Sequence, residues 1–328
     1  VLRDHAYLLG RDSLMKKYTS TKMTNAWLKF YECISMLQRE FSILPLNNFE
    51  SLHVAEAPGN FVSALHHYLR TNLPSDYEWN WRANTFEDRI EGMGYLDDAL
   101  GLIAKYRERW ILGPSGTGDI TDPRNIKHFA EKKCHLVTSD VKVVDTKNTN
   151  YDEEENMNAA VQLGHVLIAL EALLPGGTAV LKHFTLYESF SHDLVAILAQ
   201  CFEQVFVYKP ATSKAANSEV YLVGIRFQGK VPTEPLYKIL ENYRANQNYQ
   251  EKTAIYESLP KYFIERLFQI ESTLAEEQIS ELTKTLERTR KYNLKGAKVM
   301  RELEGDRIRK TSEKWIYDHN IRFLDNPL

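Results

Sequence analysis

The chain has 328 residues, of which 43% are hydrophobic and 26% charged, a composition typical of an ordinary folded globular protein. Its net charge of −3 argues against indiscriminate coating of nucleic acid, although a local basic groove remains compatible with it. No run approaches the ~20 apolar residues of a membrane span, and no signal-like segment follows Val1. We therefore expect a protein that acts away from membranes, in the cytoplasm or nucleus (including a viral protein in its host's cytoplasm), and is not secreted.

The cysteines give the same picture of the compartment. Cys33, Cys134 and Cys201 are far apart, form no Cys-x-x-Cys pair, and have no histidine at the spacing of a zinc ligand. This pattern argues against a zinc site and against a disulfide framework, and favours reduced thiols. We expect no bound metal.

The first predicted element is helical and covers residues 1–45. Thr24 is a suitable N-cap, and Pro45 ends the segment. After Thr24, apolar side chains recur at helical spacing, at Trp27, Phe30 or Tyr31, Ile34, Leu37 and Phe41.

Residues 50–227 alternate short apolar runs with helical stretches. Strands are predicted at 51–55, 77–82, 109–112, 135–139, 178–182, 204–208 and 219–227. Helices are predicted at 60–70, 95–106, 123–132, 156–173 and 189–201. Such alternation predicts an α/β fold with a mostly parallel sheet covered by helices on both faces. The last two strands are joined by a small polar loop, which favours a terminal antiparallel hairpin.

The character of the chain changes near residue 232, where strand-like runs end and Lys, Glu, Gln and Arg dominate. We therefore predict two parts: 1–231, which includes the helical segment 1–45, and a helical extension over 232–328. The favoured role of the extension is to support the core. The alternative is a module that binds a protein partner or RNA.

Charged residues stand at the ends of three predicted strands. Asp140 and Lys182 each follow an apolar run, and Glu219 begins one. A buried charge is unfavourable unless it is paired or used, so together these residues suggest an active site at one edge of the sheet. A lysine there could act as a general base if its pKa were lowered, although neighbouring carboxylates would raise that pKa. Singly, each could be a solvated charge at a strand end.

Two glycine-containing turns could contact a ligand. Glu56-Ala57-Pro58-Gly59 follows a strand, and Gly59 would let the backbone approach a ligand closely, but a tight strand–helix turn needs the same glycine. Gly113 and Gly118 have the spacing of a P-loop, yet Asp119 stands where its lysine belongs, so we exclude a P-loop. Asp119 could face a base or an amino group, or serve only as a turn residue.

In this order, the motifs resemble those of the FtsJ-type Rossmann-fold methyltransferases, most closely their mRNA cap 2′-O-methyltransferase branch. Ser139-Asp140, Val180-Leu181-Lys182 and Ser218-Glu219-Val220-Tyr221 resemble three members of the family's Lys-Asp-Lys-Glu pattern. Asn25-Ala26-Trp27-Leu28-Lys29 resembles the segment with the first lysine, for which Lys22 is the competing residue. The resemblance covers about residues 20–227.

The resemblance implies a Rossmann-like sheet that binds S-adenosylmethionine. Asp119 would contact the adenine, and Asp140 would lie between the methyl donor and Lys182. The remaining residues expected to bind the donor belong to the first turn: Glu56, Ala57, Pro58, Gly59, Asn60 and Phe61. The acidic residue expected to bind the donor's ribose is unclear, since 82–88 offers only Glu87 and Asp88.

The implied reaction is methylation of an RNA ribose 2′-OH, at the capped 5′ end of mRNA. Lys182 would act as base, Lys29 would help keep it neutral by repulsion, and Glu219 would orient a lysine. Methylation of rRNA or tRNA, or a non-catalytic RNA-binding or scaffold role, are the alternatives. Arg82, Lys209 and Lys214 are among the candidate phosphate contacts, with a solvated surface charge as the alternative for each.

Overall fold

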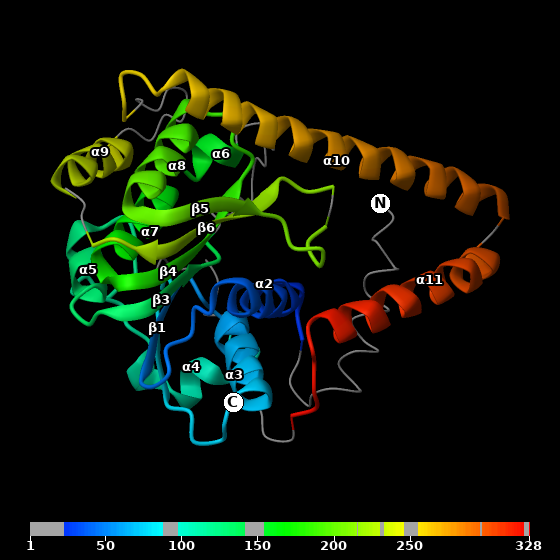
Figure 1. Cartoon of the computed structure of the whole chain (residues 1–328), viewed down its shortest axis with the longest axis horizontal. Helices are drawn as coiled ribbons and strands as arrows, with labels where there is room; N and C mark the ends of the chain where they lie inside the picture. The colour runs from blue at the N-terminus through cyan, green and yellow to red at the C-terminus, as the bar shows by residue number, and fades with distance from the viewer. Residues whose placement is uncertain are drawn as a thin grey trace.

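A six-stranded sheet forms the centre of the molecule, in the order β2-β1-β3-β4-β6-β5. The computed structural model describes residues 23–87, 98–141, 154–214, 216–229, 233–245, 255–295, 297–324 and 328. Helices cover both faces of the sheet, and two long C-terminal helices extend beyond it (Figure 1). The strands are β1 (Phe49–Val54), β2 (Trp79–Ala83), β3 (Cys134–Ser139), β4 (Leu173–Phe184), β5 (Phe202–Tyr208) and β6 (Glu219–Phe227).

The direction of β6 decides which residues meet. Strands β2, β1, β3 and β4 run parallel, whereas β6 pairs antiparallel with both β4 and β5. The first residue of β6, Glu219, therefore lies opposite Phe184 at the carboxyl end of β4. The predicted α/β fold with a terminal antiparallel hairpin is confirmed.

Successive side chains along the strands point alternately into two apolar cores, one on each face of the sheet. Leu136 and Val180 pack with α2 (Asn25–Phe41) and α3 (Asn60–Asn72), whereas their neighbours Val137 and Leu181 pack on the opposite face. That second face is covered by α5 (Pro123–Phe129), α7 (Ala159–Ala172) and α8 (Ser189–Cys201). The short elements are α4 (Leu102–Lys105), η1 (Arg107–Arg109) and α6 (Glu154–Met157).

Helix α2 begins where the sequence predicts. The Thr24 side chain accepts a hydrogen bond from the Trp27 amide, which confirms it as the N-cap. The helix ends at Phe41 and is capped by Ser42, whose backbone is left-handed with φ of 53°. Residues 1–22, including Lys22, lie outside the described residues.

The strand predicted at 109–112 is wrong. Arg107–Arg109 form a 3₁₀ turn, and Trp110 makes only an isolated bridge to Ala83. The chain then enters a left-handed turn at Gly113, with φ of 71°, so the apolar run is too short to add a strand. In the predicted helix 95–106, the described part is helical only over α4, after a left-handed Gly101.

The chain after β6 is helical, as predicted, and consists of α9 (Glu234–Ala245), α10 (Lys261–Lys295) and α11 (Ala297–Asp318). In Figure 1, α10 runs past the sheet and α11 turns back toward α2 and α3. Helix α10 contributes Leu267 to the main core, and α9 belongs to that core with four side chains. The buried side chains of α9 there are Leu236, Tyr237, Leu240 and Tyr243. A boundary at residue 231 stays a prediction.

In the described part of the chain, no helix has both the length and the apolar character that crossing a bilayer requires.

Candidate active site at the carboxyl edge of the sheet

Lys182 lies at the carboxyl end of β4, between two carboxylates. It pairs with Tyr221 across the β4–β6 ladder, and alternation from Val180 turns it toward the face that α2 covers. Its ammonium nitrogen Nζ is 3.4 Å from Asp140 Oδ1 and 3.4 Å from Glu219 Oε2. The side chain is only 9% exposed, so these contacts act with little screening by water.

A second lysine reaches the same carboxylate from α2. Lys29 Nζ is 2.5 Å from Glu219 Oε1, so Glu219 bridges Lys29 and Lys182 with its two oxygens. Asp140 Oδ1 also accepts a hydrogen bond of 3.2 Å from the Tyr221 hydroxyl. The fold thus brings Lys29, Asp140, Lys182 and Glu219 together, while their catalytic roles stay predictions.

These contacts shift the pKa values of Lys182 and Glu219. Burial opposes the charged form of Lys182, but Asp140 and Glu219 outweigh it and raise the lysine's pKa. Burial likewise favours neutral Glu219, but Lys182 and Lys29 together lower its pKa. The expectation that Lys29 keeps Lys182 neutral is not met by this arrangement, because Lys29 pairs with Glu219 and the carboxylates stabilise the Lys182 ammonium.

Lys209 fixes the loop that leads to Glu219. Its ammonium donates hydrogen bonds to the Asn217 carbonyl (2.7 Å), the Asn217 side-chain oxygen (2.5 Å) and the Glu219 carbonyl (2.7 Å). Burial lowers the pKa of Lys209 to about 8, against the opposing charge of Glu219. Arg82, the other predicted phosphate contact at a strand, donates to the Phe129 carbonyl at 3.2 Å. Both cations are therefore hydrogen-bonded within the fold, and their contact with a phosphate stays a prediction.

The turn after β1 contains the glycine that the sequence singles out. Gly59 has φ of 105°, and a Cβ there would lie 2.6 Å from Leu102 Cδ1. The Ala57–Pro58 peptide bond is cis. The left-handed backbone and the close approach to Leu102 together favour a glycine here without any ligand, and contact of Gly59 with a ligand stays a prediction.

Glu56 acts in this turn as a cap for α3. Its Oε1 accepts hydrogen bonds from the amides of Phe61 (2.7 Å) and Val62 (3.0 Å), which the helix itself leaves without partners. Burial raises the pKa of Glu56 to about 8, the charge of nearby Asp140 adds to this, and the two amides oppose it. The Asp140 amide donates to the Val54 carbonyl at 3.4 Å, which places Asp140 beside the turn.

The last two residues of the turn face inward. Asn60 Oδ1 accepts a hydrogen bond of 2.6 Å from the Thr24 hydroxyl, which ties the turn to the start of α2. Phe61 is 1% exposed and stacks on Phe30 with ring centroids 4.4 Å apart. The side chain of Phe61 therefore belongs to the core, and its amide, in the first turn of α3, donates to Glu56.

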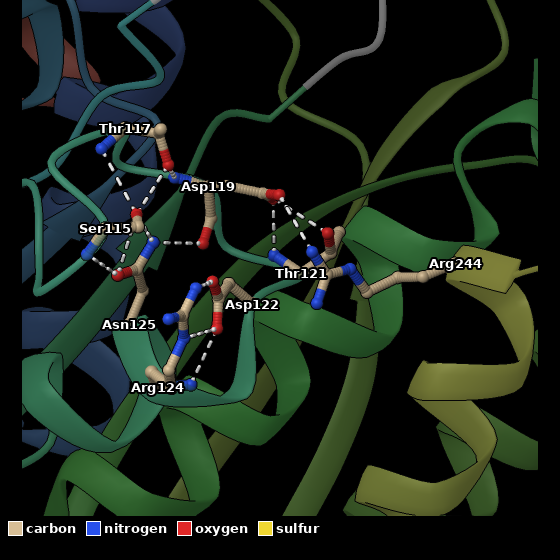
Figure 2. Close-up of polar contacts among 8 residues, drawn as sticks. All are labelled: Ser115, Thr117, Asp119, Thr121, Asp122, Arg124, Asn125 and Arg244. Atoms are coloured by element: carbon tan, nitrogen blue, oxygen red, sulfur yellow. Dashed lines mark hydrogen bonds and ion pairs between the residues drawn. The ribbon is translucent and has the colours of Figure 1, made fainter.

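Asp119 is a turn residue with a partly accessible carboxylate (Figure 2). Its Oδ1 accepts hydrogen bonds from the Thr121 amide (2.8 Å) and hydroxyl (2.7 Å), and its Oδ2 lies 3.7 Å from the Arg244 guanidinium of α9. The Asn125 side-chain amide donates to the Asp119 carbonyl at 3.0 Å. The carboxylate is 29% exposed, and its contact with an adenine stays a prediction.

Sequence reasoning assigned no role to two residues near the cluster. The Tyr221 hydroxyl contacts Asp140, and its position two residues after Glu219 on β6 places both side chains on one face. Glu32 lies one helical turn after Lys29 and is 4% exposed. In the sequence, Glu32 could have been noticed as a charged residue between Tyr31 and Cys33, on the apolar side of α2.

Among the described residues, no three His, Cys, Asp or Glu side chains form a group able to hold a metal ion.

Residues 23–227 match the family described as FtsJ-like methyltransferase. The cap-specific mRNA (nucleoside-2′-O-)-methyltransferase 2 of Danio rerio is 36% identical over 229 residues, which cover 67% of this chain and 30% of that protein. Protein L511 of Acanthamoeba polyphaga mimivirus is 30% identical over 330 residues, covering 97% of this chain and 40% of that protein. A probable methyltransferase of African swine fever virus, EP424R, is 29% identical and covers 63% of this chain and 50% of its own length.

The relatives are thus much longer than the part that matches. The chain spans 29–40% of the length of the first four curated relatives. The similarity to the mimivirus protein extends over nearly the whole chain, including α9, α10 and α11.

Proposed function

The chain belongs to the FtsJ-like methyltransferase family, and we propose that it transfers the methyl group of S-adenosylmethionine to the 2′-OH of an RNA ribose, at the capped 5′ end of mRNA. The observation that carries the proposal is the cluster of Lys29, Asp140, Lys182 and Glu219. These side chains converge from one helix and three strand ends, at the edge of the sheet where α/β enzymes bind ligands.

In the proposed reaction, Lys182 accepts the proton of the attacking hydroxyl. A ribose hydroxyl is a weak nucleophile at neutral pH, so a positioned base assists the transfer as attack proceeds. Asp140 and Glu219 hold the Lys182 amine in place, and Lys29 fixes Glu219 from the opposite side. The rest of the catalytic effect comes from orientation of the two reactants, which removes much of the entropic barrier.

Two partly exposed carboxylates, Asp140 and Asp119, suit a positively charged methyl donor. S-adenosylmethionine supplies, when bound, an electrophilic methyl group on a cationic sulfur, together with an ammonium group and an adenine. Asp140 and Asp119 are 23% and 29% exposed, so both carboxylates are accessible to such a cation. We assign donor binding to Asp119, Asp140 and the turn Glu56 to Asn60. A cation beside Lys182 would also oppose the pKa increase caused by the two carboxylates.

The choice of capped RNA is supported by the relatives. The Danio rerio protein is named as a cap-specific mRNA 2′-O-methyltransferase. The family match over 23–227 contains all four clustered residues. We further propose that 1–231 forms the catalytic part and that 232–328 supports it, with α9 built into the core.

A methyl-transfer assay tests the proposal. The full chain is incubated with labelled S-adenosylmethionine and either a capped RNA or the same RNA with a 5′-triphosphate. We expect label on the capped RNA, at a ribose 2′-OH, and loss of about 10²-fold or more in rate for Lys182→Met. Lys261→Met is the matched control, because Lys261 is 90% exposed and its ion pair within the described part of the chain is with Glu265 on its own helix.

The outcomes separate the alternatives. Equal labelling of both RNAs would contradict cap dependence and favour rRNA or tRNA as substrate. An undiminished rate in Lys182→Met would contradict the assigned base. Absence of both methyl transfer and calorimetric binding of S-adenosylmethionine in the wild type would favour a non-catalytic RNA-binding or scaffold protein.

A further inference from the structure

Glu32 is a buried carboxylate that holds three separate segments together. Its Oε1 accepts hydrogen bonds from the Tyr208 hydroxyl (2.9 Å) and the Ala211 amide (2.7 Å). Its Oε2 accepts from the Thr212 amide (3.0 Å) and hydroxyl (2.8 Å) and from the Trp315 indole N–H (3.1 Å). A carboxylate has about four acceptor sites, so both oxygens are fully occupied. All five donors are neutral groups.

The contacts of Glu32 join α2 to the loop that ends at Glu219. Tyr208, Ala211 and Thr212 lie at the start of this loop, and Lys29, one turn before Glu32, binds its last residue. The loop is therefore fixed to one helix at both ends. Lys209 closes it internally, because its ammonium donates to the Asn217 and Glu219 carbonyls.

Trp315 adds the C-terminal helix α11 to this arrangement. The indole is 8% exposed and lies against Tyr31 of α2 with ring centroids 6.3 Å apart, while its N–H donates to Glu32. The chain after α11 continues on α3, where the Asn320 side-chain amide donates to Asn72 at 3.0 Å. Helix α11 is thus connected, through one buried carboxylate, to the helix and the loop that carry Lys29 and Glu219.

We propose that Glu32 is a positioning residue that sets the separation of Lys29 and Glu219, and that Trp315 makes the C-terminal helix part of the support of the active site. The proposal rests on the proposed methyl transfer. Its physical basis is that a catalytic group displaced by about 1 Å can lose about 10²-fold in rate. The two ends of the 208–219 loop share one helix, so a shift at Glu32 is transmitted to Glu219.

Two substitutions that preserve shape test the proposal. Trp315→Phe removes the indole N–H and retains an aromatic ring against Tyr31. Glu32→Gln retains the side chain's length but replaces one acceptor with a donor that faces other donors. Both are made in the full chain, and kcat, KM for capped RNA, the affinity for S-adenosylmethionine by calorimetry and the melting temperature are measured.

Matched controls remove comparable hydrogen bonds elsewhere. Trp79→Phe removes an indole N–H that donates to the Ser51 hydroxyl at the opposite, amino end of the strands. Asp193→Asn weakens a buried carboxylate that accepts from the Ile255 and Tyr256 amides, away from the loop. These controls measure how much rate is lost through a general decrease in stability.

We expect kcat to fall about tenfold or more in both test variants, with KM and donor affinity within about twofold of wild type and with smaller changes in the controls. Hydrogen exchange in the peptide 208–219 should accelerate about tenfold, the equivalent of one lost hydrogen bond. An unchanged kcat in both variants, or an equal fall in the controls, would overturn the proposal. If the wild type transfers no methyl group, the proposed function fails, and the exchange data then decide: faster exchange in Trp315→Phe supports the link, and unchanged exchange refutes it.

Discussion

The Lys29 ammonium and the Glu219 carboxylate lie 2.5 Å apart although 190 positions separate them in the chain. Glu219 also contacts Lys182 at 3.4 Å, so one carboxylate connects helix α2 with the end of the central strand β4. The cluster is therefore a property of the assembled sheet and helix α2, and no short segment contains it. Its four members can be tested one at a time.

Lys29→Met should lower kcat by about tenfold to a hundredfold, because Glu219 loses the partner that fixes it from the side of α2. The same substitution at Lys22 distinguishes the two candidates for the first lysine and should leave kcat within about twofold. Initial rates on capped RNA at saturating donor give the comparison. A large effect at Lys22 with none at Lys29 would transfer the role to Lys22.

The rate of methyl transfer should rise with pH. The pKa of Lys182 is raised, because Asp140 and Glu219 outweigh burial, so the ammonium predominates at neutral pH and the amine fraction grows as pH increases. A base of this kind gives a limiting slope of about tenfold per pH unit. Single-turnover rates between pH 6.5 and 8.5 measure it. A rate independent of pH over this range would contradict Lys182 as base.

The raised pKa of Lys182 also affects folding stability. By linkage, the free energy of unfolding that its two carboxylates contribute is fully present below the unfolded-state pKa of the lysine and is lost as pH rises through the folded-state pKa.

Gly59→Ala should destabilise the turn after β1 and weaken binding of S-adenosylmethionine. The new alanine would have to adopt a φ of 105°, and its Cβ would lie 2.6 Å from Leu102 Cδ1. The matched control is Gly176→Ala, where φ is 84° but nothing lies within 4 Å. Strained backbone alone accounts for about 1–3 kcal/mol, so the difference between the variants in urea unfolding isolates the clash with Leu102. Equal destabilisation would show that the contact with Leu102 is unimportant.

Glu56→Gln should become more stable than the wild type as pH rises. Burial raises the pKa of Glu56 from 4.5 to about 8, so between these values the folded chain holds a proton that the unfolded chain releases. The wild type therefore loses stability over that window, by about 1.4 kcal/mol for each unit of pKa difference, whereas the variant does not. Urea unfolding at pH 5 and pH 8 measures the effect, with Glu40→Gln at an exposed position as control. Parallel pH profiles of Glu56→Gln and wild type would contradict the raised pKa.

Most of the fold could be predicted from periodicity and turn residues. Helix α8 and strand β6 have the predicted bounds, and the absence of a helix between β5 and β6 correctly indicated an antiparallel pair. The predicted strand 109–112 failed because an apolar run does not reveal whether a neighbouring strand has room for it. There the chain makes one bridge at Trp110 and turns at Gly113.

The site could be predicted in outline and not in its electrostatics. The positions of Asp140, Lys182 and Glu219 at strand ends follow from the sequence, but their pKa values depend on contacts made across the sheet. The expected neutral Lys182 assumed repulsion by Lys29, whereas Glu219 lies between the two lysines. The role of Glu32 could not be predicted from the sequence, because its five hydrogen-bond donors come from parts of the chain up to 283 positions away.

Helix α9 limits where this protein can be divided. Leu236, Tyr237, Leu240 and Tyr243 are buried in the core shared by α5, α7 and α8, although they lie beyond residue 227, where the family match ends. A chain ending before α9 would expose that apolar surface to water, at about 1.5–3 kcal/mol for each large side chain. A piece expected to remain folded must therefore extend at least through Ala245, and recombinant fragments cut at the edge of the matched region should aggregate.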